Sequence, residues 1–172
     1  EIYTLSLHDA LPICASDFVY GIVKSSAGGL MNLLPAIIFV IGAVIAFATG
    51  TSWGTFGILI PIVVDVFSGT NHELMIISIS ACMAGAVCGD HCSPISDTTI
   101  MASAGAQCEH VNHVSTQLPY AMVAAVVSFL TYIVAGFVQT PWIALPAGIA
   151  FMAIALVIIR VKFDDQIGRA HV

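Results

Sequence analysis

The spacing of apolar residues along the chain predicts membrane-spanning helices. A helix that crosses the hydrocarbon core of a bilayer needs about 20 apolar residues. Two segments approach or reach that length with no charge before Arg160, at residues 118–138 (LPYAMVAAVVSFLTYIVAGFV) and 143–161 (IALPAGIAFMAIALVIIRV). The linker QTPW between them is short and polar, and its Trp142 is typical of a membrane interface. We therefore expect a helical hairpin here.

Two further apolar regions, residues 33–67 and 74–106, are each interrupted by polar sequence that contains glycine or proline. The first is interrupted at residues 49–55 (TGTSWGT) and the second at residues 90–97 (DHCSPISD). Non-helical backbone at membrane depth is tolerated only where it is buried in protein or lines a wet cavity. We therefore predict an all-α, polytopic integral membrane fold with about four transmembrane segments, two of them discontinuous. Paired broken helices are typical of a transporter.

Composition supports the membrane assignment. The 172 residues are 59% hydrophobic and 8% charged, with a mean hydropathy of +1.01, against roughly 25% charged residues in a soluble domain. The net charge is −6, and four Lys plus Arg residues form no basic stripe that could neutralise a phosphate backbone. The lipid bilayer is thus an expected partner, whereas nucleic acid is not, and a soluble enzyme is disfavoured.

The two ends of the chain look foreign to the rest. Residues 1–13 (EIYTLSLHDALPI) and 166–172 (QIGRAHV) resemble translated sequencing-adapter read-through, with native surface tails as the alternative. We assign residues 14–165 to one transmembrane unit. Because the first residue is Glu rather than Met, we expect a fragment.

The second interruption carries the chemistry that we consider first. Asp90 and Asp97 flank Pro94 in an otherwise apolar region, where ionisable side chains are costly and indicate function. Na⁺ prefers oxygen ligands, and unwound backbone adds free carbonyls to the two carboxylates. A carboxyl group removed from water keeps its proton until a cation replaces it, which is the competition that ion/proton exchange requires. Hydroxyl groups nearby belong to Ser93, Ser96, Thr98 and Thr99.

Simpler roles remain open for these residues. Asp97 is a favoured type of N-cap for a half-helix that begins at Thr98. Asp90 would be an interfacial carboxylate if the interruption lies nearer the membrane surface. His91 fits either a proton relay or a hydrogen-bonded packing histidine.

The first interruption is uncharged and complements the second. It offers the hydroxyls of Thr49, Thr51 and Ser52 beside Gly50, a composition suited to exposing carbonyls and helix ends. The alternative is a glycine-rich kink that packs closely on a neighbouring helix. Cys88, His91 and Cys92 superficially suggest zinc, but no fourth ligand is suitably spaced. We expect no cofactor and no metal beyond transported Na⁺.

Two strings resemble the C-terminal part of the NhaC-type Na⁺/H⁺ antiporter family: ATGTSWGTFGILIPI (48–62) and GDHCSPISDTTIMASAGAQCEHVNHVSTQLPYA (89–121). The resemblance implies a multi-pass secondary transporter of the bacterial cytoplasmic membrane that exchanges Na⁺ for H⁺. It also implies internal repeats, with this chain as the C-terminal half and the missing N-terminal half of the same protein as the other wall of the site. A homo-oligomer stays open. The residues that carry the resemblance are Thr49, Gly50, Thr51, Ser52, Trp53, Asp90, Ser93, Pro94, Ser96, Asp97 and Thr98.

The transported substrate is less certain than the family, because the resemblance extends to malate/lactate antiporters and amino-acid permeases. An organic-anion exchanger is mildly disfavoured because no Arg or Lys falls at membrane depth in this half. An intramembrane aspartyl protease would need carboxylates that share a proton, and the sequence around Asp90 lacks the GxGD form. A purely structural membrane subunit would not explain the paired interruptions.

Overall fold

The computed structural model describes residues 29–67 and 71–170, with side chains described between Met31 and Val161. The adapter-like residues 1–13 lie outside this range, and residues 166–170 continue the last helix. The described part is all-helical. Its helices are α2 (Gly29–Thr49), α3 (Ser52–Phe67), α4 (His72–Cys92), α5 (Asp97–Gly105), α6 (His110–Val138) and α7 (Pro141–Ala170).

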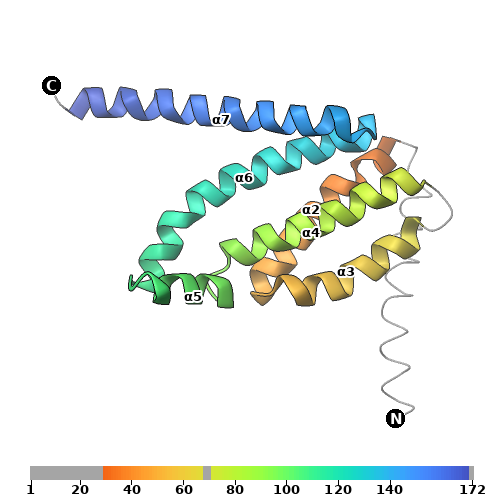
Figure 1. Ribbon diagram of the computed structural model, residues 1–172, viewed down its shortest axis with the longest axis horizontal. Coiled ribbons are helices and arrows are strands. Elements are labelled where there is room, and N and C mark those ends of the chain that lie inside the picture. Colours follow the sequence, from red (N-terminus) through yellow and green to blue (C-terminus); the bar gives the residue numbers. More distant parts are fainter. Residues whose placement is uncertain (1–28, 68–70, 171–172) are drawn as a thin grey trace, which may run out of the picture.

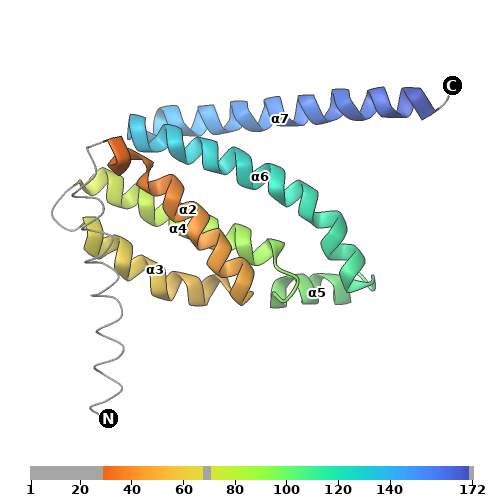
Figure 2. The same ribbon diagram turned by 180° about the vertical axis from the view of Figure 1, so that it is seen from behind.

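Helices α2 and α4 run side by side in the same direction, and α3 runs back from the end of α2 along α4 (Figure 1). Helix α6 packs across α2 and α4, and α7 covers α6 on the outer side (Figure 2). Four helical stretches are long and apolar enough to cross a membrane, and they are Met31–Thr49, His72–Cys92, His110–Val138 and Pro141–Val161. The expected count of about four spans agrees with this result.

The predicted hairpin of the last two spans is confirmed by α6 and α7. Gln139 ends α6 in a left-handed conformation with φ of 52°, and α7 begins two residues later. Helix α6 begins earlier than the pattern indicated, since the polar residues from His110 to Gln117 are helical rather than a loop. These two polar turns are held in place by hydrogen bonds between His110 and Ser103 of α5 and between Gln117 and His91 at the end of α4.

The two interruptions occur where they were expected, but the helices that flank them differ from the prediction. We expected residues 33–67 and 74–106 each to form one discontinuous span. Instead, α2 and α4 are each long enough to span alone. Helix α3 folds back beside α4 rather than continuing the direction of α2 (Figure 1). The reversal occurs at Gly50, whose φ of +68° lies in the left-handed region that glycine adopts without steric cost.

Small residues allow α2 and α4 to approach closely. An added Cβ at Gly85 or Gly89 of α4 would overlap the backbone carbonyl of Phe39 or Ala43 on α2. The same holds for Gly136 of α6 against Asn32. Membrane helices associate through such close packing because lipid supplies no hydrophobic driving force between them.

The ends of the helices are fixed by polar contacts. Asn71 caps α4 by accepting the backbone N–H groups of Glu73 and Leu74 at 3.1 and 3.4 Å. Its amide also donates to the Oε1 atom of Gln139 at 3.1 Å, which ties the start of α4 to the end of α6.

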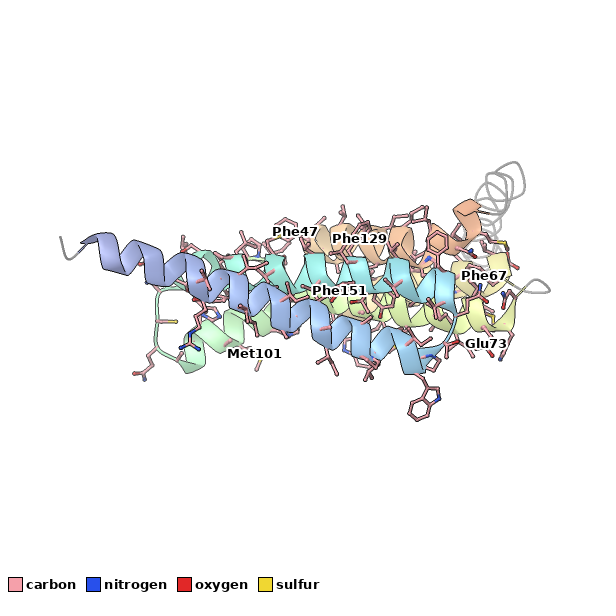
Figure 3. All side chains as sticks on the ribbon, turned by 90° about the horizontal axis from the view of Figure 1, so that it is seen from above. Phe47, Phe67, Glu73, Met101, Phe129 and Phe151 are labelled. Atoms are coloured by element: carbon pink, nitrogen blue, oxygen red, sulfur yellow. The ribbon has the colours of Figure 1, made fainter. Side chains whose placement is uncertain are left out.

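Apolar side chains point outward around the bundle, as at the exposed Met101 of α5 (Figure 3). Such outward apolar surface suits contact with lipid.

Candidate functional site

The second interruption is a short non-helical segment, residues 93–96, between α4 and α5. Ser93 and Ser96 are extended, and Pro94 and Ile95 between them form a turn. Helix α4 ends at Cys92 because Pro94 disfavours helical backbone in the residue before it, and Ser93 is accordingly extended with φ −75° and ψ 129°. The backbone N–H of Ser93 still donates to the carbonyl of Asp90 at 3.1 Å. The last turn of α4 therefore places Asp90 directly before this non-helical segment.

Asp90 is a buried carboxylate, with 3% of its surface exposed. The hydroxyl of Ser96 donates to its Oδ1 atom at 2.7 Å. Because Ser96 has one hydroxyl proton, the 2.7 Å contact between its oxygen and the Thr98 hydroxyl leaves Thr98 as the donor. Thr98 is exposed, whereas Ser96 and Ser93 are fully buried. A row of hydroxyl groups thus leads from the surface of the described chain to the buried carboxylate.

Asp97 does not join this row. Its side chain is exposed at the first turn of α5, where its Oδ1 atom accepts the backbone N–H of Thr98 at 2.9 Å. The N-cap residue of α5 is Ser96, and Asp97 is the first helical residue, so Asp97 is not the N-cap that the sequence suggested. Pro94 is exposed, and exposed His91 bonds through Nδ1 to the carbonyl of Val87 at 2.9 Å within its own helix.

In the first interruption, several hydroxyls are engaged by nearby backbone. Thr49 donates to the carbonyl of Ile45 at 2.8 Å, and Thr55 donates to the carbonyl of Thr51 at 2.9 Å. The Thr51 hydroxyl accepts the backbone N–H of Gly54 at 3.3 Å, an N-capping contact for α3. Ser52 is half-buried at the first position of α3. These side chains shape the turn, while Gly50 provides the contact with the second interruption.

Gly50 brings the two interruptions together. Gly50 is buried, and a Cβ added there would lie 3.0 Å from both Cγ1 and the carbonyl oxygen of Ile95. Two segments that are 45 positions apart in the sequence are therefore in direct contact. The structure thus joins the two sequence motifs into one region, with Asp90 as its buried carboxylate.

Two buried hydroxyls in the described chain have no hydrogen-bond partner. Thr99 of α5 is 3% exposed and Ser78 of α4 is fully buried, yet neither Oγ1 of Thr99 nor Oγ of Ser78 is bonded. A buried polar group without a hydrogen-bond partner is costly, so each such group needs an explanation, and a function in binding is one. Thr99 lies at the first turn of α5, close in sequence to Ser96 and Thr98. Of the two unbonded hydroxyl oxygens, that of Thr99 is the nearer in sequence to the hydroxyls that lead to Asp90.

Sequence reasoning missed how α6 holds the second interruption. The Nε2 atom of His110 lies 2.7 Å from the carbonyl oxygen of Pro94, and the amide of Gln117 donates to the carbonyl of His91 at 2.7 Å. Nothing in the spacing of the polar run QCEHVNHVSTQ (107–117) indicates these long-range contacts. Only the polar character of the first helical turns of α6 could have suggested them.

Comparison with known proteins identifies the family. The model of the Na⁺/H⁺ antiporter family matches residues 15–137, which is more than two thirds of the chain. The chain belongs to the Na⁺/H⁺ antiporter family. The family is one of membrane transporters, and the four long apolar helices of the described part agree with a multi-pass membrane protein. The matched residues include both interruptions and the row of hydroxyls that ends at Asp90.

The names of the similar proteins give different transported substrates. A protein of Haemophilus influenzae described as uncharacterized is 53% identical over 129 residues, which are 75% of this chain and 24% of that protein. The malate-2H⁺/Na⁺-lactate antiporter of Bacillus subtilis is 32% identical, with 63% of this chain and 24% of the relative covered. The arginine/ornithine antiporter of Halobacterium salinarum is 33% identical, with 63% and 23% covered.

The chain thus spans about a quarter of the length of the curated relatives that it matches. No solved structure shows a significant match.

Proposed function

We propose that this chain forms the ion-binding part of a Na⁺/H⁺ antiporter in the cytoplasmic membrane of a bacterium. The observation that carries the proposal is the buried Asp90 carboxylate at the end of α4, hydrogen-bonded to Ser96 in the interruption. Membership in the Na⁺/H⁺ antiporter family supports the same reading. An intramembrane carboxylate is costly unless it is paired, so the energetics favour a function for Asp90.

In the proposed mechanism, a proton and Na⁺ compete for Asp90. Either ion supplies the positive charge that a buried carboxylate lacks. Na⁺ would then take oxygen ligands from Asp90, from the hydroxyls of Ser93 and Ser96, and from backbone carbonyls of residues 93–96. The Thr98 hydroxyl connects this set to the exposed surface. Because one carboxylate cannot hold both ions, each ion leaves as the other binds.

Thr99 and Gly50 support this arrangement. The Thr99 hydroxyl is buried and unbonded, which suits an oxygen that meets its partner only when an ion is present. Gly50 keeps the first interruption in contact with Ile95, so that the carbonyls of both segments lie near one another. In this proposal Asp97, Thr49, Thr51, Ser52 and His91 serve the outer part of the site and its shape rather than the exchange step.

The remainder of the full-length protein would supply the other wall of the site. The relatives are about four times as long as the matched segment, so most of the fold lies outside this chain. Transport by the isolated segment is therefore not expected. The bilayer and the remainder of the same protein, which is more than the half that the sequence suggested, are the partners that we propose.

Exchange of organic solutes is the second candidate. It is favoured by the relatives, of which one is named for malate and lactate and one for arginine and ornithine. The N-terminus of α5 carries partial positive charge and could face a substrate carboxylate. The two candidates differ in one measurable respect, because an organic-solute exchanger moves protons only when its solute is present.

The test uses the full-length protein in inside-out vesicles that contain a pH-sensitive dye. Na⁺, Li⁺, K⁺, malate and arginine are added in turn to wild type, Asp90→Asn, Asp97→Asn and Glu73→Gln. Glu73 is the matched control, since it is an exposed carboxylate at the other end of α4. We expect Na⁺-driven proton movement that Asp90→Asn abolishes and that the other two variants retain.

Other results would change the conclusion. Normal exchange by Asp90→Asn would refute the proposed ion site. Loss of exchange in Asp97→Asn alone would move the site to the exposed carboxylate. Proton movement that needs malate or arginine would establish the second candidate, and no movement with any solute would favour a structural subunit.

A further inference from the structure

Helix α6 contacts the chain on both sides of Ser93 through its first two polar turns. The side-chain amide of half-buried Gln117 donates to the backbone carbonyl of His91, in the last turn of α4, at 2.7 Å. The Nε2 atom of His110 lies 2.7 Å from the carbonyl oxygen of Pro94, within the non-helical segment. Gln117 and His110 are seven positions apart, which is close to two helical turns, so they lie on one face of α6. One helix therefore holds the end of α4 and the segment that follows it.

The backbone carbonyls at the end of α4 depend on donors from outside the helix. The last four carbonyls of an α-helix have no partner within that helix. The carbonyl of Asp90 accepts the backbone N–H of Ser93 at 3.1 Å. For the next carbonyl, that of His91, the donor in the described part of the chain is the Gln117 amide. Without this amide the last turn of α4, which carries Asp90, would fray more readily.

The hydrogen bond between Ser96 and Asp90 crosses the same interruption. Asp90 belongs to the last turn of α4, whereas Ser96 is the N-cap residue of α5. Their 2.7 Å contact therefore depends on how far apart the two helix ends are held. A relative shift of about 1 Å would break it, because a donor–acceptor distance of about 3.6 Å is no longer a hydrogen bond.

We propose that Gln117 is a positioning residue, which anchors the last turn of α4 to α6 and so fixes Asp90 relative to Ser96. The anchor itself rests on the hydrogen bonds, whereas its effect on ion exchange rests on the proposed function. Gln117 does not touch the transported ion in this proposal. Without the anchor, Asp90 and Ser96 are in place for a smaller fraction of the time. The apparent affinity for Na⁺ then falls with that fraction, while turnover at saturating Na⁺ is retained.

The opposite end of the same two helices provides a matched control. There the side-chain amide of Asn71, which caps α4, donates to the Oε1 atom of Gln139 at the end of α6, at 3.1 Å. Gln139→Met removes one hydrogen bond between α4 and α6, as Gln117→Met does, but far from Asp90. The two variants should therefore lower the thermal unfolding midpoint by similar amounts and differ only in their effect on the site.

Hydrogen exchange tests the anchor without any need for transport. The backbone amides of residues 91–96, apart from Pro94, are followed in the full-length protein. Gln117→Met keeps the length of the side chain but cannot donate, so these amides should exchange about fivefold faster, the effect of one net hydrogen bond. Gln117→His should restore slow exchange, because its Nε2 atom extends about as far and can donate. Gln139→Met should leave the same amides unchanged.

The vesicle assay then tests the link to transport with the same variants. Gln117→Met should raise the KM for Na⁺ by about fivefold with kcat unchanged, and Gln117→His should return the KM towards that of wild type. Gln139→Met should leave both parameters unchanged. A purely structural role for Gln117 would instead give the same kinetic result for both methionine variants.

Each contrary result has a distinct meaning. Unchanged hydrogen exchange in Gln117→Met, or no recovery in Gln117→His, would refute the anchor. Faster exchange with an unchanged KM would refute the positioning role, and so would an equal rise of KM in Gln139→Met. If wild type moves no protons when Na⁺ is added, the proposed function is wrong, and hydrogen exchange alone then decides whether α6 anchors the end of α4.

Discussion

Replacing Gly89 by alanine should force α2 and α4 apart directly beside the candidate site. A Cβ at Gly89 would overlap the carbonyl oxygen of Ala43, where the neighbouring atoms are rigid backbone. Ordinary contact between such atoms needs about 3.5 Å, so the helices must separate by about 1.5 Å. Overpacking of this kind costs about 1–3 kcal/mol. Alanine favours the helix over glycine by about 1 kcal/mol, so the net loss of unfolding free energy is about 0–2 kcal/mol.

A series of glycines in the same bundle provides the controls. Gly57 of α3 has no atom within 4 Å of an added Cβ, so Gly57→Ala should leave stability unchanged or raise it by up to about 1 kcal/mol. A Cβ at Gly42 would lie 3.2 Å from the carbonyl oxygen of Cys82, a mild crowding that should nearly cancel the gain in propensity. Stability should therefore decrease in the order Gly57→Ala, Gly42→Ala, Gly89→Ala.

The midpoint of thermal unfolding of the full-length protein, measured in the same detergent for all variants, gives this order. Gly89→Ala should also weaken the apparent affinity for Na⁺, because it moves the backbone next to Asp90. Equal unfolding midpoints for Gly89→Ala and Gly57→Ala would refute the inference that the α2–α4 contact is packed backbone to backbone.

Three further substitutions test single contacts of the site. Ser96→Ala removes the 2.7 Å donor to buried Asp90 and should cost about 1–3 kcal/mol of unfolding free energy, whereas Ser115→Ala, exposed on α6, should cost little in the same thermal assay. Thr99→Val replaces an unbonded buried hydroxyl, so the unfolding midpoint should stay or rise while the KM for Na⁺ increases; an unchanged KM would exclude Thr99 from the site. Gly50→Ala introduces a side chain at φ +68° against Ile95 and should lower the unfolding midpoint, whereas Gly57→Ala should not.

The membrane spans were predictable from the sequence because their signal is local. Residues 118–138 and 143–161 are continuous apolar runs, and length alone assigns them to helices that cross a bilayer. The positions of both interruptions were equally visible, since Gly50 and Pro94 disrupt regular helix through their own backbone preferences. The direction of the chain after an interruption is not local. The return of α3 beside α4 depends on packing between α2, α3 and α4, which no short stretch of sequence specifies.

The candidate site was predictable in its residue types but not in the roles of its two carboxylates. Asp90 and Asp97 are seven positions apart, a spacing that places two side chains on one face of a continuous helix of 3.6 residues per turn. The non-helical segment from Ser93 to Ser96 interrupts the helix, so this spacing no longer places the two side chains on one face. As a result Asp97 is exposed at the start of α5, and the hydroxyl of Ser96 points to Asp90 in its place.

This change of partner has a chemical consequence for exchange. Two buried carboxylates on one face would repel each other and share a proton, whereas one carboxylate with a hydroxyl donor can bind a single proton or a single monovalent cation with the same net charge. The geometry therefore favours one-for-one competition at Asp90. If exchange is one-for-one, Na⁺ uptake and proton release should change in equal amounts, and the vesicle assay should show no dependence on membrane potential. A strong dependence would require a second titrating group, which the missing part of the protein would have to contribute.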